Sequence, residues 1–239
     1  MRHMLDERAD GIVPERKVAE MTAEHDYDER ERILDAALEL AEEKGWERVR
    51  LHEVARAAGV GLERIHRHFP EKEALVDAWF DRADRAMLKA ADAPGFYALP
   101  LRERLERLLW AWLDALASHR RVTRQMLLNK LEPGHLHVQI LGIWRISRTV
   151  QWWREAAGIR HAWLRRALEE TALTAVYLAV FLTWLEDDSP DHGRTRRRLR
   201  RLLELGEGLG CCPSIEAPAA LDAPEAEGQR QAAPPERVA

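Results

Sequence analysis

Cysteine is scarce in this chain of 239 residues, which contains only two. Cys211 and Cys212 are adjacent, so they cannot cross-link distant parts of a fold, and such usage is typical of a reducing compartment. Long hydrophobic runs are also missing, since the longest, Thr171 to Leu185, has 15 residues, whereas a bilayer span needs about 18. No basic start leads into an apolar signal segment. We therefore expect a cytoplasmic protein without stable membrane insertion.

The chain has no large excess of charge of either sign. Its 37 Lys and Arg and 41 Asp and Glu give a formal net charge of −4, which neither favours nor excludes nucleic acid as a partner. The acidity lies in the two ends, residues 1–26 and 213–239, and the body between them is slightly basic. With 46% hydrophobic residues, the chain is long and apolar enough to bury a substantial core.

The groups that catalysis requires do not converge in the sequence. His135 and His137 are two residues apart and would point to different sides of a helix, and no Cys or carboxylate pattern completes a metal site. Neither a Gly-x-Ser-x-Gly elbow nor a phosphate-binding Gly-Lys-Ser/Thr loop occurs. We therefore expect no enzyme, no metal site and no cofactor.

Helical spacing of apolar residues dominates between the two ends, and no segment alternates long enough to suggest a sheet. We expect an all-α fold of about nine helices between an N-terminal extension, residues 1–26, and a C-terminal tail, residues 211–239, both without regular structure. Gly45 can end the first helix, and the Phe69-Pro70 pair opens the fourth. The later helices are expected at 51–58, 62–68, 70–91, 101–119, 121–131, 135–157, 161–186 and 191–209.

Two of these predicted helices are short and are separated by Gly59. Ala55 lies four residues before that glycine, and a small residue there lets two helices cross closely while glycine forms the turn. Such a helix-turn-helix can present its second helix to a DNA major groove, although two packed helices alone would look similar. The small core would comprise Val54, Ala58, Val60, Ile65 and Phe69. The exposed face would carry Arg64, His66, Arg67 and His68, followed by Lys72.

Three stretches extend this pattern: ILDAALELAEEKGW from Ile33, VARAAGV from Val54 and IHRHFPEKEAL from Ile65. Together they resemble the N-terminal domain of TetR-type bacterial regulators. The resemblance implies a TetR-like fold with a DNA-binding head at 27–75 and a ligand-binding and dimerisation body at 76–210. It also implies a ligand-responsive transcriptional repressor that binds a palindromic double-stranded DNA operator as a homodimer.

The same resemblance assigns phosphate contacts within the head. His68 and Lys72 match family positions that bind phosphate oxygens, for which Lys72 needs only its point charge. His66 replaces the usual Tyr and Arg64 the usual Thr or Ser, and both can still donate to phosphate. Two positions that usually cap helices carry other residues, so cap hydrogen bonds of about 1 kcal/mol each are expected to be missing. These are Arg50 and Gly61.

The positions that face bases in the family are His52, Leu62 and Glu63. Glu63 departs most from the family pattern, because its carboxylate opposes the phosphate charge. It could accept a hydrogen bond from a cytosine amino group, or it could pair with Arg67 four residues later.

Seven of the nine tryptophans lie beyond residue 100. They can fill space between helices, or some can line an apolar cavity for a small ligand. The residues selected as candidate walls are Trp112, Met126, Trp144 and Tyr177. Because few polar groups cluster nearby, the ligand would be bulky and apolar or aromatic.

A second resemblance covers residues 165–205, which look like the C-terminal region of lipid-binding accessory proteins of ubiquinone biosynthesis. It implies an alternative function as an isoprenoid or lipid carrier of TetR-like fold. The terminal amphipathic helix that would dock such a carrier on a membrane is not evident.

The resemblance to TetR-type regulators implies that the last two long helices, about 161–186 and 191–209, form the homodimer interface as a four-helix bundle. The apolar run at 171–185 suits that role, because a large apolar face is rarely left in water. Six arginines occur among the eight residues from Arg194 to Arg201. They can form a solvated face, pair with Asp187, Asp188 and Asp191 or with a partner subunit, or meet anionic lipid.

Overall fold

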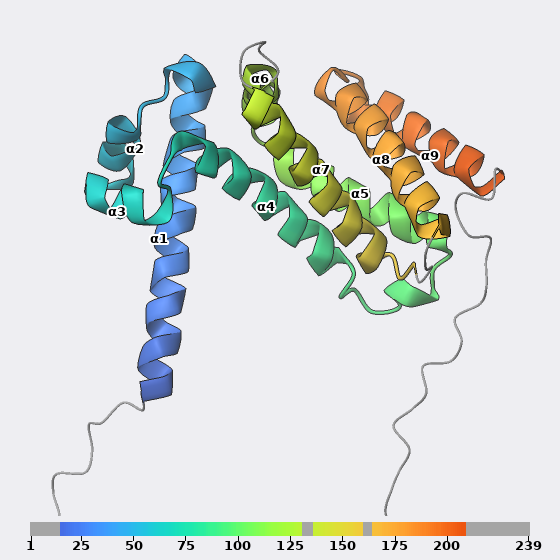
Figure 1. Cartoon of the computed structure of the whole chain (residues 1–239), viewed down its shortest axis with the longest axis horizontal. Helices are drawn as coiled ribbons and strands as arrows, with labels where there is room; N and C mark the ends of the chain where they lie inside the picture. Colours follow the sequence, from blue (N-terminus) through green and yellow to red (C-terminus); the bar gives the residue numbers. More distant parts are fainter. Residues whose placement is uncertain (1–14, 131–135, 160–163, 209–239) are drawn as a thin grey trace, which may run out of the picture.

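The computed structural model of the chain describes residues 15–130, 136–159 and 164–208, and within these ranges it contains nine α-helices and no strand. This confirms the predicted all-α fold. Figure 1 shows α1 with the two short helices α2 and α3 at its side, and α4 leading from this head to the body. The helices are α1 (Glu15–Lys44), α2 (Leu51–Ala58), α3 (Leu62–His68), α4 (Lys72–Ala90), α5 (Leu101–Ala117), α6 (Arg120–Lys130), α7 (Leu136–Ala156), α8 (Leu164–Leu185) and α9 (Gly193–Gly208).

The head is held together by apolar side chains from its three helices. The stripe predicted on α1 is buried, and it packs with the buried side chains of α2 and α3. Each large aliphatic or aromatic side chain buried in this way contributes about 1.5–3 kcal/mol. The predicted small core is confirmed, with Val60 only partly buried at its edge. Its buried members are Ile33, Leu34, Ala37, Leu38, Ala41, Val54, Ala55, Ala58, Ile65 and Phe69.

The turn between α2 and α3 depends on Gly59. Its φ of 67° and ψ of 32° lie in the left-handed region, which glycine adopts without the steric cost of a Cβ. The amide of Val60 then donates to the carbonyl of Ala55 at 2.9 Å, which closes the end of α2. This turn orients α3 relative to α2, as the spacing predicts.

Two helix starts differ from the prediction. Helix α1 begins at Glu15, so residues 15–26 are helical and not an irregular extension, whereas residues 1–14 lie outside the described part of the chain. Helix α4 begins at Lys72 with Glu71 as its N-cap, so Pro70 precedes the helix instead of occupying its first turn. The tail after 208, including Cys211 and Cys212, also lies outside the described residues.

The body has an aromatic core between α4, α5 and α8. Trp112 of α5 meets the rings of Tyr177 and Phe181 of α8 at centroid distances of 5.2 and 5.1 Å, and Phe80 of α4 stacks on Trp112 at 5.9 Å. Edge-to-face and stacked pairs of this kind add about 0.5–1.5 kcal/mol each beyond area burial. The aromatic core therefore fixes α4 against the rest of the body.

Helix α8 contains a 20-residue segment, Arg166–Leu185, that is long and apolar enough to cross a membrane by those two criteria. The core helix of a soluble protein passes the same test. In this structure α8 packs against α6, α7 and α9, and its inner side chains are buried.

Candidate nucleic-acid interface

Helix α3 has two distinct faces. Ile65 and the following Phe69 point into the head and are buried. The opposite face is open to solvent, with Leu62 at 56% exposure. The four side chains of this outward face are Leu62, Glu63, His66 and Arg67.

Two side chains predicted to contact DNA are bound to α1 in this structure. Arg64 donates from Nε and Nη2 to the two carboxylate oxygens of Glu29, both at 2.7 Å. His68 places Nε2 at 3.0 Å from Glu29 Oε1, and its side chain is only 4% exposed. The Glu29 side chain is itself 6% exposed. The ring of His68 is therefore turned toward α1 and away from solvent.

This arrangement sets the charge of Glu29. The pKa of the Glu29 carboxyl is lowered from 4.5 to about 2, chiefly by the hydrogen bond from Arg64. Burial raises the pKa, but the effects of Arg64 and His68 together outweigh it. A bidentate pairing of guanidinium and carboxylate is also geometrically selective. Glu29 thus fixes the orientation of α3 on α1. It lies in the segment from residue 15 that continues α1 toward the N-terminus, past α3 (Figure 1).

Glu63 and Arg67 form an ion pair on the outward face. Arg67 Nη2 lies 2.7 Å from Glu63 Oε1, and the two side chains are 53% and 79% exposed. Of the two roles that the sequence left open for Glu63, the pairing with Arg67 is present in the structure. Exposed pairs at this spacing contribute only about 0.3–0.5 kcal/mol, so the two side chains can exchange partners at low cost.

Lys72 lies where α4 begins, beside the turn after α1. Its Nζ donates to the carbonyl oxygens of Trp46 at 2.7 Å and Glu47 at 3.1 Å, and it sits 4.8 Å from the centre of the Trp46 ring. Partial burial lowers the pKa of Lys72. An ammonium group has three donors, so one N–H remains for an external acceptor.

The starts of α2 and α3 lack side-chain cap hydrogen bonds, as the sequence predicts. Neither Arg50 nor Gly61 makes a side-chain cap hydrogen bond. Glu53 substitutes in part, because its carboxylate accepts from the backbone amide of Arg50 at 3.2 Å and from Lys44. His52 is exposed at the start of α2.

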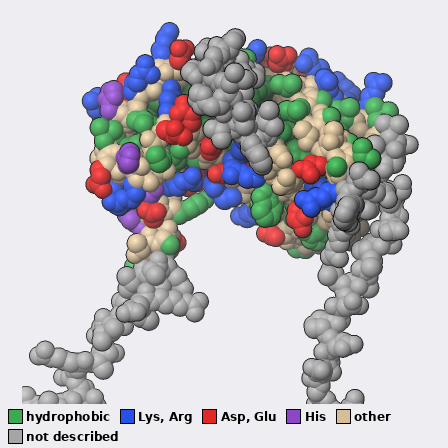
Figure 2. Space-filling view, viewed as in Figure 1, with side chains coloured by type: hydrophobic (Ala, Val, Ile, Leu, Met, Phe, Trp, Pro, Cys, Tyr) green, Lys and Arg blue, Asp and Glu red, His purple; other side chains and the backbone are tan. Residues whose placement is uncertain are grey.

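The surface over α2 and α3 is mixed in charge. Figure 2 shows His, Lys and Arg side chains beside acidic ones at the head end of the molecule. This agrees with the small basic excess of the sequence between residues 45 and 72.

The residues selected for a ligand pocket are mainly core residues. Trp112, Met126 and Tyr177 are each no more than 3% exposed, and Trp112 contacts Tyr177 as described above. The side chain of Trp144 lies outside the described residues. A separate open groove of about 620 Å³ lies between α5 and α9, and it is lined by mixed charges and Trp110. Arg196 of α9 lies over that ring, 3.7 Å from its centre.

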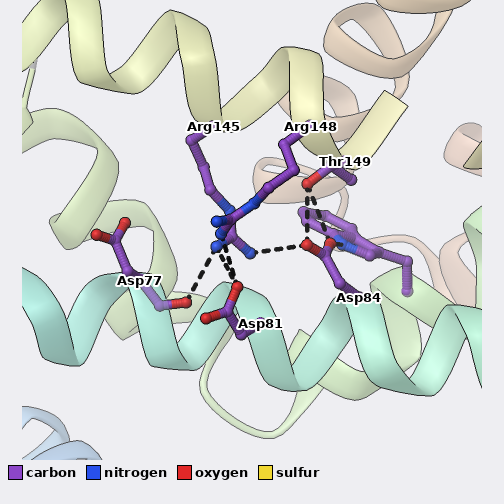
Figure 3. A network of polar contacts seen from close by, with 7 residues as sticks. Asp77, Asp81, Asp84, Arg145, Arg148 and Thr149 are labelled. Atoms are coloured by element: carbon purple, nitrogen blue, oxygen red, sulfur yellow. Dashed lines mark hydrogen bonds and ion pairs between the residues drawn. The ribbon is translucent and has the colours of Figure 1, made fainter. Parts of the chain in front are cut away.

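A buried polar cluster joins α4 to the body, and sequence reasoning missed it (Figure 3). Asp84 of α4 accepts from Trp112 Nε1 at 2.8 Å, from Thr149 Oγ1 at 3.0 Å and from Arg145 Nη2 at 3.0 Å. Arg145 also binds the carboxylate of Asp81, one turn earlier. The helix that carries the head is therefore tied to α5 and α7 by charged hydrogen bonds, next to the aromatic core.

The outer face of α8 and α9 is partly apolar. Leu168, Leu182 and Leu205 are each more than half exposed. Two of the three acids proposed as partners for the arginine run are engaged elsewhere: Asp187 accepts from Ser189 and Thr195, and Asp188 pairs with Arg120. The third, Asp191, accepts from Arg196 Nε through its backbone carbonyl at 3.2 Å. Within the run Arg194–Arg201, which the structure describes, four exposed arginines have no ion pair, namely Arg194, Arg197, Arg198 and Arg201.

Comparison with known proteins agrees with this architecture. Residues 33–79 match the family model described as bacterial regulatory proteins, tetR family. A TetR transcriptional regulator from Nitrosomonas europaea is 48% identical, with a TM-score of 0.67, over 75% of this chain and 98% of that one. The chain belongs to the TetR family.

Other relatives of this TetR-family regulator are more distant or match only in part. The HTH-type transcriptional repressor KstR of Mycolicibacterium smegmatis is 38% identical over 81 residues, which cover 32% of this chain and 40% of that repressor. The HTH-type regulator YhgD of Bacillus subtilis is 26% identical over 74% of this chain and 94% of its own length. The comparisons favour a transcriptional regulator over a lipid carrier.

Proposed function

We propose that this chain is a ligand-responsive repressor that binds a palindromic operator as a homodimer in the cytoplasm. The observation that carries the proposal is the exposed outward face of α3, on a chain that belongs to a family of transcriptional regulators. In a helix-turn-helix dimer the second helices enter successive major grooves about 34 Å apart.

Two groups of residues contribute to DNA binding in this proposal. Leu62, Glu63, His66 and Arg67 face the bases or the groove walls, with His52 at the adjoining start of α2, and Lys72 gives its remaining N–H to a phosphate. Arg64 and His68 act indirectly, because their bonds to Glu29 hold α3 in place. Arg50 and Gly61 contribute through the backbone at the starts of α2 and α3.

The homodimer is proposed to form through α8 and α9. Leu168, Leu182 and Leu205 would be covered there, and exposed apolar side chains gathered on one face are typical of interfaces. The unpaired arginines of α9 then lie beside the interface, where acids of the partner subunit can neutralise them.

The ligand is proposed to be a small apolar or aromatic molecule that enters among the aromatic side chains of the body. Trp112 connects the aromatic core to α4, since its ring packs on Tyr177 and its Nε1 donates to Asp84 of α4. A ligand that separates the two rings therefore strains the bond to α4, which carries the head. A shift of a few ångströms at the head would remove phosphate contacts in both half-sites.

The proposal is tested by selecting DNA from a random double-stranded pool with the full chain. We expect a palindrome with major-groove half-sites one helical turn apart, and release of that DNA by an apolar ligand identified by screening. For Lys72→Ala we expect weaker binding and a shallower dependence of log K on log salt, by about 0.9 for one lost phosphate contact. Lys89→Ala, at the far end of α4, is the matched control. Sequence-independent, weak binding by the unaltered chain contradicts the proposal.

A further inference from the structure

We propose that Glu63 and Arg67 act together as a base-reading unit that selects a C·G base pair in each operator half-site. This inference rests on the proposed function and names the DNA feature that the head recognises. The juxtaposition that supports it is a carboxylate and a guanidinium paired at 2.7 Å on the solvent side of α3.

Two other basic side chains of α3, Arg64 and His68, are bound to α1. Arg64 is committed to Glu29 through two hydrogen bonds of 2.7 Å, and His68 is 4% exposed beside the same carboxylate. Of the arginines of α3, Arg67 is the one whose guanidinium lies on the outward face. Sequence-specific donation from this helix therefore depends mainly on Arg67 and on its neighbour His66.

Glu63 brings a carboxylate toward the groove on the outward face of α3. A carboxylate inserted between two phosphate strands is repelled unless a donor compensates it. In the major groove the donors on base edges are the amino groups of cytosine and adenine, and Glu or Asp is the usual acceptor for cytosine. The 79% exposure of Glu63 leaves its second oxygen free to reach such an amino group while the first remains near Arg67.

Donors and acceptors follow a fixed order along the major-groove edge of each base pair. A C·G pair presents the cytosine amino donor next to the O6 and N7 acceptors of guanine along one groove edge. A carboxylate followed by a guanidinium presents the complementary order, acceptor and then donor. An A·T pair offers its amino donor between acceptors and a thymine methyl group, so it gives Arg67 no bidentate site. The paired side chains therefore match C·G better than A·T.

The experiment compares DNA pools selected by the unaltered chain, Glu63→Gln and Glu103→Gln. Glu103 is an exposed glutamate of α5, so its variant removes the same charge in the body. We expect the unaltered chain and Glu103→Gln to select a C·G pair at one fixed position of each half-site. For Glu63→Gln we expect that preference to fall by roughly 10- to 100-fold and to move toward A·T, because Gln pairs with adenine. Unchanged helix content and thermal midpoint of this exposed variant confirm that the fold is retained.

Arg67→Ala provides a second test, because it should lose the same base preference while its other half-site preferences remain. The proposal is overturned if Glu63→Gln selects the same base as the unaltered chain, or if the unaltered chain selects a palindrome without a fixed C·G pair. In either of these cases the proposed function still stands, since a palindrome has been selected. A chain that selects no DNA overturns both.

Discussion

Replacement of Asp84 by alanine should destabilise the chain more than any change of an exposed acid. The variant leaves three buried donors without an acceptor: the indole of Trp112, the hydroxyl of Thr149 and one arm of Arg145. Removal of one member of a buried charged pair costs about 3–5 kcal/mol, mainly because the other charge stays buried and unpaired. Asp84 is 7% exposed, so water does not readily replace it.

The contacts around Asp84 narrow the expected loss of stability in Asp84→Ala. Arg145 keeps the carboxylate of Asp81, which reduces the loss toward the lower end, about 3 kcal/mol. Thr149→Val removes one neutral donor to the same carboxylate and should cost only about 1 kcal/mol. For Asp84→Asn we expect an intermediate loss, because the amide oxygen can still accept from Trp112 while its NH₂ opposes Arg145.

The assay is urea unfolding at one fixed protomer concentration, because association changes the apparent stability. Asp92→Ala, an exposed acid just beyond α4, is the control and should stay within about 0.5 kcal/mol of the unaltered chain. If Asp84→Ala unfolds with the same midpoint as Asp92→Ala, the polar cluster does not hold α4 to the body, and the proposed route from ligand to head loses its support.

Three other outcomes follow from the head and the outer face of the body. The pKa of Glu29 is lowered from 4.5 to about 2, so the stabilisation by its charge is fully present above pH 4.5 and is lost as the pH falls toward 2. Glu29→Gln should therefore reduce the loss of stability between pH 4.5 and 2. If the variant loses stability over this range as the unaltered chain does, Glu29 is not the group responsible. Arg64→Ala should leave the salt slope of DNA binding unchanged, whereas a slope reduced by about 0.9 would mean that Arg64 leaves Glu29 for phosphate. Leu182→Glu should shift the chain to monomers in sedimentation, while Leu128→Glu, on an equally exposed leucine of α6, should not.

The sequence predicted the helices best where an apolar stripe meets a clear stop. Helices α2 and α3 were expected at 51–58 and 62–68 and occur there, because Gly59 forms the turn and Val54, Ile65 and Phe69 point inward. The sequence does not predict the start of α1, because half of residues 15–26 are charged and those whose burial is described are exposed. Such a helix has no apolar periodicity to detect.

The orientation of the polar side chains was harder to predict. Glu29 is 35 residues from Arg64, and it was not expected to reach α3, so Arg64 and His68 were assigned to the outer face. Similarly, Asp84 and Arg145 are 61 residues apart, and only the packing of α4 against α7 brings them together. Local pattern predicts which face of a helix is apolar, but it does not identify the partner of a charged group across the fold.

The head is joined to the body at a second place besides α4. Gln125 of α6 accepts from the backbone amide of Trp46 at 2.7 Å, and Arg121 of the same helix binds Glu42 near the end of α1. A chimaera that transplants only residues 15–75 onto another regulator would lose these contacts. Its head would then be joined to the body through α4 alone and could change its orientation. Moving the first turns of α6 together with the head is therefore the design that should preserve operator spacing in a hybrid sensor.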